Sequence, residues 1–261
     1  MRRIAKALIL GSVLLVAAVV AHGAAPVEFT DTFRLADCTF SDSGRNPYFS
    51  LQSGDQLVLE GEDDGETVVV QITVLRDRQS ISFDTQDGVR LTVRTRVIEE
   101  REWVGDELVE VSRNFFARCV QTNDVFYFGE DVDIYDGGAI VSHDGAWRAG
   151  SNGALPGLIM PGTFLLGSRY FQEVAPDVAL DRAEHVRAGF EVDVPVGTLS
   201  DCVEVHETTP LEPRALSVKI YCAGIGLVDD SGAQLADLEI DGSADTAGTE
   251  PRPPRRRQDA R

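Results

Sequence analysis

The sequence predicts an all-β, β-dominated fold, built as an antiparallel curved sheet or a partly open barrel. Apolar and polar residues alternate with a period of two along many short runs, which are rich in valine, threonine and aromatic residues. Turn signals interrupt the runs about every ten residues, as is typical of antiparallel strands joined by short turns. We therefore expect one such sheet, crossed by an apolar Gly/Pro-rich loop, with at most one short helix.

The predicted strands follow one another along the chain with short turns between them. They span residues 56–60, 67–75, 89–100, 107–119, 124–130, 190–197, 201–209, 216–224 and 235–241. The turn GEDDGE separates the first two strands. Arginines and acids alternate along one face of several strands, which predicts cross-strand ion pairs in water.

The stretch 145–174 has a different texture, because glycine and proline are frequent among its apolar residues. We interpret it as an apolar loop that packs over an opening of the sheet. Leu158, Ile159, Met160 and Phe164 are its candidate ligand-binding residues. The following stretch, 177–189, has room for one or two helical turns.

The N-terminal segment predicts a secretory signal peptide over residues 1–23. Basic residues precede an apolar run at 7–21, and small residues follow it. This run is shorter than the roughly 20 residues that span a bilayer, so an uncleaved anchor is the alternative. We expect an exported protein, periplasmic or extracellular, with no transmembrane segment after cleavage.

The rest of the chain divides by composition into three parts. Residues 24–45 are a variable lead-in, residues 46–241 a single β-rich domain, and residues 242–261 a disordered basic tail. The tail is either a frayed terminus or an electrostatic tether.

The chain is strongly acidic, with a formal net charge of −19. Such a charge excludes nucleic acid and anionic membrane surfaces as partners. It favours a cationic ligand or basic partner, unless it serves only solubility. The apolar candidate loop points to a small apolar ligand instead, so both ligand classes stay open.

Four cysteines, Cys38, Cys119, Cys202 and Cys222, suggest two disulfide bonds in an exported protein. Pairing the strands at 201–209 and 216–222 about Glu212 places Cys202 opposite Cys222. That pairing leaves Cys38 for Cys119. Buried free thiols are the alternative.

The acidic stretch FGEDVDIYDGGAIVSHDG, residues 128–145, predicts a β-hairpin whose turn contains Asp136 and two glycines. Phe126 and Phe128, with Val132 and Ile134, would then form the apolar face, and Asp131, Asp133 and Tyr135 the solvent face. Calcium is the cofactor to consider, because hard oxygen ligands suit an acidic exported protein. The calcium candidates are Asp131, Asp133 and Asp136, although the EF-hand pattern fails there.

No catalytic motif emerges from the sequence. There is no GxSxG, HExxH, phosphate loop or dinucleotide fingerprint. Ser142, His143 and Asp144 are consecutive, but sequence neighbours on a strand point to opposite faces, so their adjacency does not make a catalytic triad. Glu204 and His206 share one strand face and are two candidate zinc ligands, but the sequence indicates no third ligand.

Four segments together resemble a family of secreted bacterial proteins that has no assigned activity. These are NPYFSLQSGDQLVLEG (46–61), FYFGED (126–131), GAWRAGSNGALPGLIMP (145–161) and VDVPVGTLSDCVEVHETTPLEPRALSVKIYCAGIGLV (192–228). Members start near NPYF and finish with TPLEP, a strand and a GIGLV-like close. The resemblance implies an exported β-rich domain and no catalytic residues. Ile220 and Cys222 depart from the family pattern, so the second disulfide would be a local feature.

From these observations we expect an exported, non-catalytic β-rich protein that binds a ligand or another envelope component. The alternatives are a carboxylate- or metal-dependent hydrolase near residues 130–144 and a calcium-stabilised structural protein.

Overall fold

The computed structural model describes residues 28–240, and the predicted signal peptide and basic tail lie outside this range. Within it the chain forms β-strands and a single short 3-10 helix, η1(Leu35–Asp37). The strands are β1(Phe40–Ser41), β2(Arg45–Asn46), β3(Phe49–Ser50), β4(Gln56–Asp63), β5(Glu66–Asp84), β6(Arg90–Val104), β7(Glu107–Cys119), β8(Val125–Asp136), β9(Ala139–Ser142), β10(Trp147–Arg148), β11(Leu155–Met160), β12(Arg169–Phe171), β13(Glu173–Val174), β14(Arg182–Val194), β15(Gly197–Thr208), β16(Ser217–Cys222), β17(Gly226–Asp230) and β18(Ala233–Glu239).

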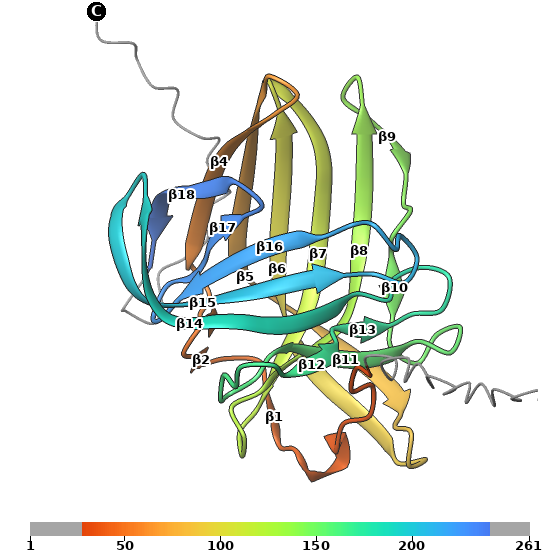
Figure 1. Cartoon of the computed structure of the whole chain (residues 1–261). Coiled ribbons are helices and arrows are strands. Elements are labelled where there is room, and N and C mark those ends of the chain that lie inside the picture. Colours follow the sequence, from red (N-terminus) through yellow and green to blue (C-terminus); the bar gives the residue numbers. More distant parts are fainter. Residues whose placement is uncertain (1–27, 241–261) are drawn as a thin grey trace, which may run out of the picture.

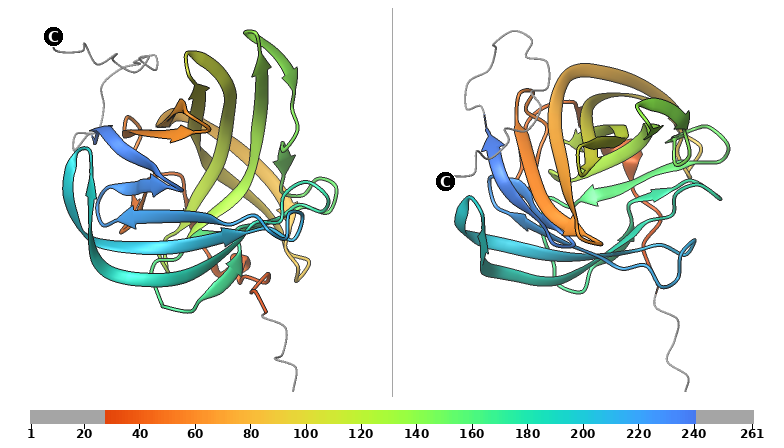
Figure 2. Two further views of the ribbon diagram at one scale, coloured as in Figure 1. Left: turned by 45° about the horizontal axis from the view of Figure 1, so that its top comes forward. Right: turned by 90° about the horizontal axis from the view of Figure 1, so that it is seen from above.

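One antiparallel sheet of sixteen strands curls into a nearly closed barrel (Figures 1 and 2). Its order is β12-β14-β15-β16-β17-β18-β4-β5-β6-β7-β8-β11-β13, with β1, β9 and β10 paired at the side of this path. The path begins at β12 and ends at β13, which follow each other in the chain. No hydrogen-bonded ladder joins these two strands, so the barrel has one open seam. This architecture confirms the predicted fold class.

Two local predictions are wrong. The stretch 145–174 is not one continuous loop, because it contains the four short strands β10 to β13. The stretch 177–189 forms no helical turn, since most of it belongs to β14. In both cases pairing with a neighbouring strand outweighs local sequence preference. For example, Leu158 of β11 lies opposite Phe126 of β8, and Ala183 of β14 lies opposite Glu207 of β15.

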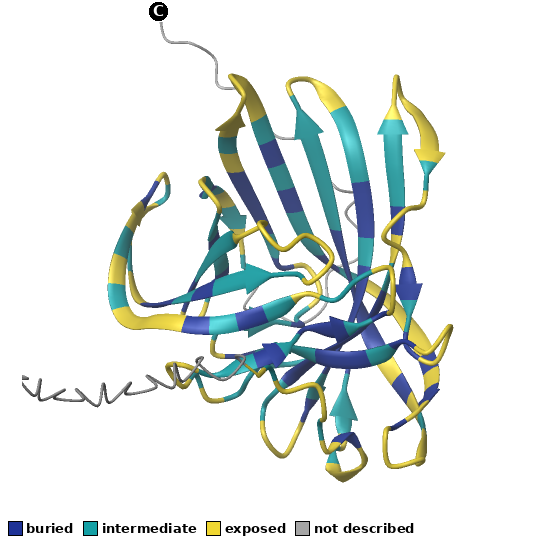
Figure 3. Cartoon of the chain, turned by 45° about the vertical axis from the view of Figure 1, so that its right-hand side comes forward, coloured by how far each residue is buried: buried dark blue, intermediate teal, exposed yellow. Residues whose placement is uncertain are grey.

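The long strands β5 to β8 bury residues on both faces, which the alternation pattern did not predict. In β6, Val93 and Val97 are buried on one face, and Ile98 is buried on the other. In β6, β7 and β8 the buried residues cluster in the lower half and exposed residues lie toward the upper tips, whereas most of the lower part of β5 is exposed (Figure 3). In one half, other segments of the chain therefore cover the outer face of the sheet. In the other half, the sheet curls around the interior of the barrel.

The segment before the predicted domain is part of the fold. Thr30 bridges to Tyr170, Leu35 is buried in the core, and β1 pairs with β7. A disulfide bond joins Cys38 to Cys119 beside this pairing.

The second disulfide bond joins Cys202 to Cys222, which lie directly opposite each other in the β15–β16 ladder. Both predicted disulfides are thus confirmed, and they indicate an oxidising environment. Between residues 28 and 240, no helix has the length and apolar character needed to cross a membrane.

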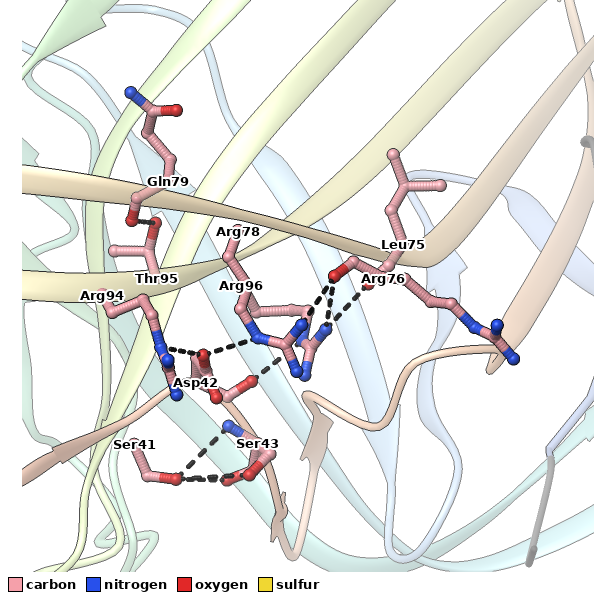
Figure 4. A network of polar contacts seen from close by, with 10 residues as sticks. All are labelled: Ser41, Asp42, Ser43, Leu75, Arg76, Arg78, Gln79, Arg94, Thr95 and Arg96. Carbon is pink, nitrogen blue, oxygen red and sulfur yellow. Dashed lines mark hydrogen bonds and ion pairs between the residues drawn. The ribbon is translucent and has the colours of Figure 1, made fainter. Parts of the chain in front are cut away.

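A buried arginine fixes the lead-in segment to the long strands (Figure 4). Arg96 is 2% exposed, and its guanidinium donates to the backbone oxygens of Asp42, Leu75 and Arg76 at 2.8, 3.1 and 3.2 Å. The Asp42 carboxylate accepts in turn from Arg78 and from Arg94. The network ties residues 41–43 to the bulge of β5.

We expect Arg96→Met to lower the free energy of unfolding by about 3 kcal/mol, because the backbone oxygens of Asp42, Leu75 and Arg76 each lose a hydrogen bond from the buried guanidinium. Arg76→Met is the matched control, since this exposed side chain points away from the network (Figure 4). Urea denaturation of both variants measures the difference. Equal midpoints for the two variants would contradict the role of Arg96.

Candidate functional site: a cavity inside the barrel

A cavity of about 200 Å³ lies within the barrel, and strands from every part of the chain line it. Its volume is below the roughly 300–1,000 Å³ of drug-sized pockets, so it suits a small ligand. Apolar residues form most of the wall from β4, β5 and β17, whereas β6 and β7 contribute both apolar and polar residues.

The apolar wall comes mainly from β3 to β6 and β17. Phe49 packs edge to face on Phe116 of β7, with ring centroids 5.0 Å apart. The inward positions of the paired strands β4, β5 and β6 continue this wall. Its members are Tyr48, Phe49, Leu57, Ile72, Val74, Ile98, Phe116, Ile159, Ile225 and Leu227.

The polar wall contains five carboxyl groups and one ammonium group. The acids are Asp55, Glu100, Glu173, Asp181 and Glu207, and the ammonium belongs to Lys219. Besides Lys6, which lies outside the described residues, Lys219 is the only lysine in the sequence.

Cations neutralise only part of this wall. Arg45 approaches Asp55 to 2.9 Å, and the Nζ atom of Lys219 lies 3.4 Å from Glu207 and 3.1 Å from Asp230. Within residues 28–240, the carboxyl groups of Glu100, Glu173 and Asp181 form no ion pair. The wall therefore carries an excess of carboxyl groups.

The seam of the barrel contributes a polar side chain without a full set of partners. Gln172 lies between β12 and β13 and is 3% exposed. Its Nε2 atom donates to Glu207 at 2.6 Å, but its buried Oε1 atom has no hydrogen-bond partner among the described residues. This acceptor belongs to a side chain that lines the cavity.

Gly157 lets the seam approach β11 closely. A Cβ atom at this position would lie 2.5 Å from the backbone carbon and oxygen of Gln172, so no other residue fits without a shift of the backbone. The backbone N–H of Gln172 donates to the oxygen of Asp181, and the N–H of Asp181 donates to the Glu173 carboxylate at 2.7 Å. The local fold thus holds Gln172, Glu173 and Asp181 together at the cavity.

Burial raises the pKa of the carboxyl groups on this inner face. The pKa of Glu100 rises to about 6, chiefly through burial, although Lys219 opposes the shift. Burial also raises the pKa of Glu173 well above its ordinary value, with Asp181 and Glu130 adding to the effect. Glu130, opposite Asn114 on the same inner face, has its pKa raised to about 7. These groups are protonated at a higher pH than free carboxyls.

The structure brings only one of the four predicted ligand-binding residues to this cavity. Ile159 lines the apolar wall. Leu158 and Met160 pack in the core, and Phe164 stacks on His185 with ring centroids 3.7 Å apart. The three residues outside the cavity wall belong to the strand and loop that close the barrel.

The predicted hairpin at 128–145 is present as β8 and β9, and Gly137 and Gly138 in its turn have positive φ angles. Its predicted face is wrong at one point. A bulge at Gly129, with φ of +139°, places Tyr127 and Glu130 on the same face. Val132 and Ile134 consequently face inward with Glu130, opposite to Phe126 and Phe128.

The candidate calcium ligands lie on or beyond the outer face of β8. Asp131 pairs with Arg148 at 2.5 Å, and Asp133 pairs with Arg113 and His143. Asp136 lies at the turn. Among the described residues, no three potential metal ligands gather in one place. Calcium binding at these aspartates stays a prediction.

The three histidines within residues 28–240 lie outside the cavity wall. His206 pairs with Glu204 at 2.9 Å on β15, as predicted from their shared strand face. His185 is buried between Phe164 and Tyr170, and burial lowers its pKa to about 4. His143 contacts Asp133 on the outer face.

Sequence reasoning missed the residues of the polar wall. One signal was available, because Lys219 is an isolated lysine in a strongly acidic chain. A second signal was the series of even-numbered residues in β6, in which the apolar Ile98 is followed by the acidic Glu100 and Glu102 on the same strand face. The position of Gln172 at the seam had no local signal, since it depends on which strands close the barrel.

A second hollow, of about 340 Å³, lies outside the barrel between β2, β3 and residues 223–225. Asn46, its central polar side chain, already donates to the oxygens of Asn123 and Pro161 and accepts from the N–H of Tyr48. The Asn46 amide therefore needs no hydrogen bond from a ligand, and we take the cavity inside the barrel as the candidate site.

Comparison with known proteins gives no family model, curated protein or solved structure that matches this chain. The functional argument therefore rests on the cavity itself.

Proposed function

We propose that the chain is an exported, non-catalytic protein that binds a small ligand inside its open barrel. The observation that carries this proposal is the cavity of about 200 Å³, which is lined by many apolar side chains and by several carboxyl groups, three of which form no ion pair among the described residues. Ligand sites are typically concave and mostly apolar, with a few polar groups that orient the ligand. Two disulfide bonds support export.

Octyl probes test the proposal, because they combine one polar group with an apolar chain of modest size. We expect at least one of octan-1-ol, octylammonium and octanoate to raise the thermal midpoint of the purified protein. Ile72→Trp places a large side chain at the cavity wall and should abolish the rise. Val120→Trp is the matched control, since Val120 is 50% exposed and lies outside the cavity wall.

The proposal fails if none of the three probes raises the midpoint of the folded protein, or if the rise survives in Ile72→Trp as fully as in Val120→Trp. Circular dichroism of both variants confirms that they fold.

A carboxylate-dependent hydrolase is the second candidate. The raised pKa values of Glu100 and Glu130 favour it, because a general acid at neutral pH needs such a value. Mass spectrometry of small molecules that copurify with the protein separates the two functions. A binding protein returns the same mass after incubation, whereas a hydrolase returns two products.

A further inference from the structure

We infer that the ligand of the barrel is a small amphiphilic cation, such as an alkyl ammonium compound. The inference rests on the proposed function and names the chemical class of its ligand. The charged group lies among Glu100, Glu173 and Gln172, and the apolar part lies against the wall of β4, β5 and β17.

The charge balance of the wall is the first argument. Five carboxyl groups face the cavity against one lysine, and Arg45 neutralises one further acid, Asp55. Glu207 shares Lys219 with Asp230, so this ammonium is already bound on two sides. A bound cation would give Glu100 and Glu173 the ion-pair partner that neither has among the described residues. A bound anion would instead meet an excess of carboxyl groups.

The orphan acceptor at the seam is the second, independent argument. The Oε1 atom of Gln172 is buried and has no donor among the described residues. A buried acceptor without a partner destabilises the folded state, so a hydrogen-bond donor in the cavity is favoured. An ammonium group supplies three N–H donors and no acceptor, which matches an amide oxygen beside carboxylates.

The arrangement of these groups around one residue is the third argument. Glu207 accepts from Gln172 and is coupled electrostatically to both Glu100 and Glu173. The Oε1 atom of Gln172 and the carboxyl groups of Glu100 and Glu173 are therefore gathered around Glu207 in one part of the polar wall. The apolar wall from Leu57 to Leu227 leaves the remainder of the cavity for hydrocarbon.

Calorimetric titration with three probes of equal chain length tests the ligand class. We expect octylammonium to bind at least about tenfold more tightly than octan-1-ol, as one charge-assisted hydrogen bond implies. Octanoate should bind more weakly than the alcohol.

Isosteric variants locate the charged group. We expect Glu100→Gln and Glu173→Gln each to weaken octylammonium binding about fivefold or more, with little change for octan-1-ol. Glu62→Gln is the matched control, because Glu62 is an exposed glutamate of β4 that is not part of the cavity wall. Two separate variants keep the test valid if one of them fails to fold.

The outcomes separate the two proposals. If octan-1-ol or octanoate binds as tightly as octylammonium, the cation inference is wrong and the binding function stands. If octylammonium binds equally well to the Glu100, Glu173 and Glu62 variants, the inference is also wrong. If no probe binds to the folded protein, the proposed function itself is wrong.

Discussion

Glu130→Gln is expected to stabilise the protein at pH 8 by about 2 kcal/mol and to leave its stability at pH 5 nearly unchanged. Burial raises the pKa of Glu130 from 4.5 to about 7, because the charged form is poorly solvated on the inner face of the sheet. The folded state therefore holds this proton more tightly than the unfolded state does. The ionised side chain costs stability above pH 7, and glutamine removes that cost.

The sign of the pH dependence follows from the same shift. Between pH 4.5 and pH 7 the folded state binds more protons than the unfolded state, so stability falls as the pH rises. Glu100, with a pKa of about 6, acts in the same direction. Burial raises the pKa values of Glu102, Glu110, Glu173 and Asp181 as well.

One buried group opposes this trend. His185 has its pKa lowered to about 4, so the unfolded state takes up its proton first as the pH falls below 6.5. This costs about 2 kcal/mol at pH 5, against a gain on the order of 4 kcal/mol from Glu100 and Glu130 together. We expect the natural protein to be more stable at pH 5 than at pH 8.

Urea denaturation at pH 5, 6, 7 and 8, at constant ionic strength, measures this profile for the natural protein and for Glu130→Gln. Glu62→Gln serves as the exposed control on β4. A natural protein that is most stable at pH 8, or a Glu130→Gln variant that follows the control at every pH, would contradict the prediction.

Acids that weaken the fold at neutral pH bear on the function of the barrel. Glu102 and Glu110 lie directly opposite each other in the β6–β7 ladder, an arrangement that destabilises a sheet. Local conflicts of this kind are expected where a site is built for a ligand. The inner acidic face thus agrees with the cavity argument, since a bound cation would relieve part of the repulsion.

The parts of the fold that depend on local pattern were predictable. Alternation located the long strands, and the register of Cys202 with Cys222 followed from a hairpin centred on Glu212. The turn after Asp136 followed from its two glycines, which have positive φ angles.

The parts that depend on closure of the barrel were not predictable. Whether the even-numbered face of β6 meets water or the cavity depends on how far the sheet curls, and its alternation is the same in either case. Arg94 and Glu100 share this face, yet Arg94 is exposed and Glu100 lines the cavity. The bulge at Gly129 moved the inward set of β8 by one residue, a shift that a fixed period cannot anticipate.

Removal of the disulfide between Cys38 and Cys119 is expected to lower the free energy of unfolding by about 4 kcal/mol. The bond spans 81 residues, and the loss of entropy that a cross-link imposes on the unfolded chain grows with the length of the loop. The bond between Cys202 and Cys222 spans 20 residues, for which the same relation gives about 3 kcal/mol.

The two bonds also differ in what else holds their partners together. Cys202 and Cys222 sit in a ladder with six paired positions, so their strands stay together without the bond. Cys38 precedes β1, which pairs with β7 at only two positions. Loss of this bond should therefore loosen the lead-in segment in addition to lowering the global stability.

Denaturant titration of the variants C38A/C119A and C202A/C222A compares the two bonds, and limited proteolysis follows the lead-in. We expect the first variant to unfold at the lower denaturant concentration and to be cut between residues 28 and 41 while the rest of the domain stays intact. The buried Leu35 and the Arg96 contact to Asp42 oppose this release. If C202A/C222A is the less stable variant, or if the lead-in of C38A/C119A resists the protease as in the natural protein, the lead-in is held by its packing and the long-range bond contributes little.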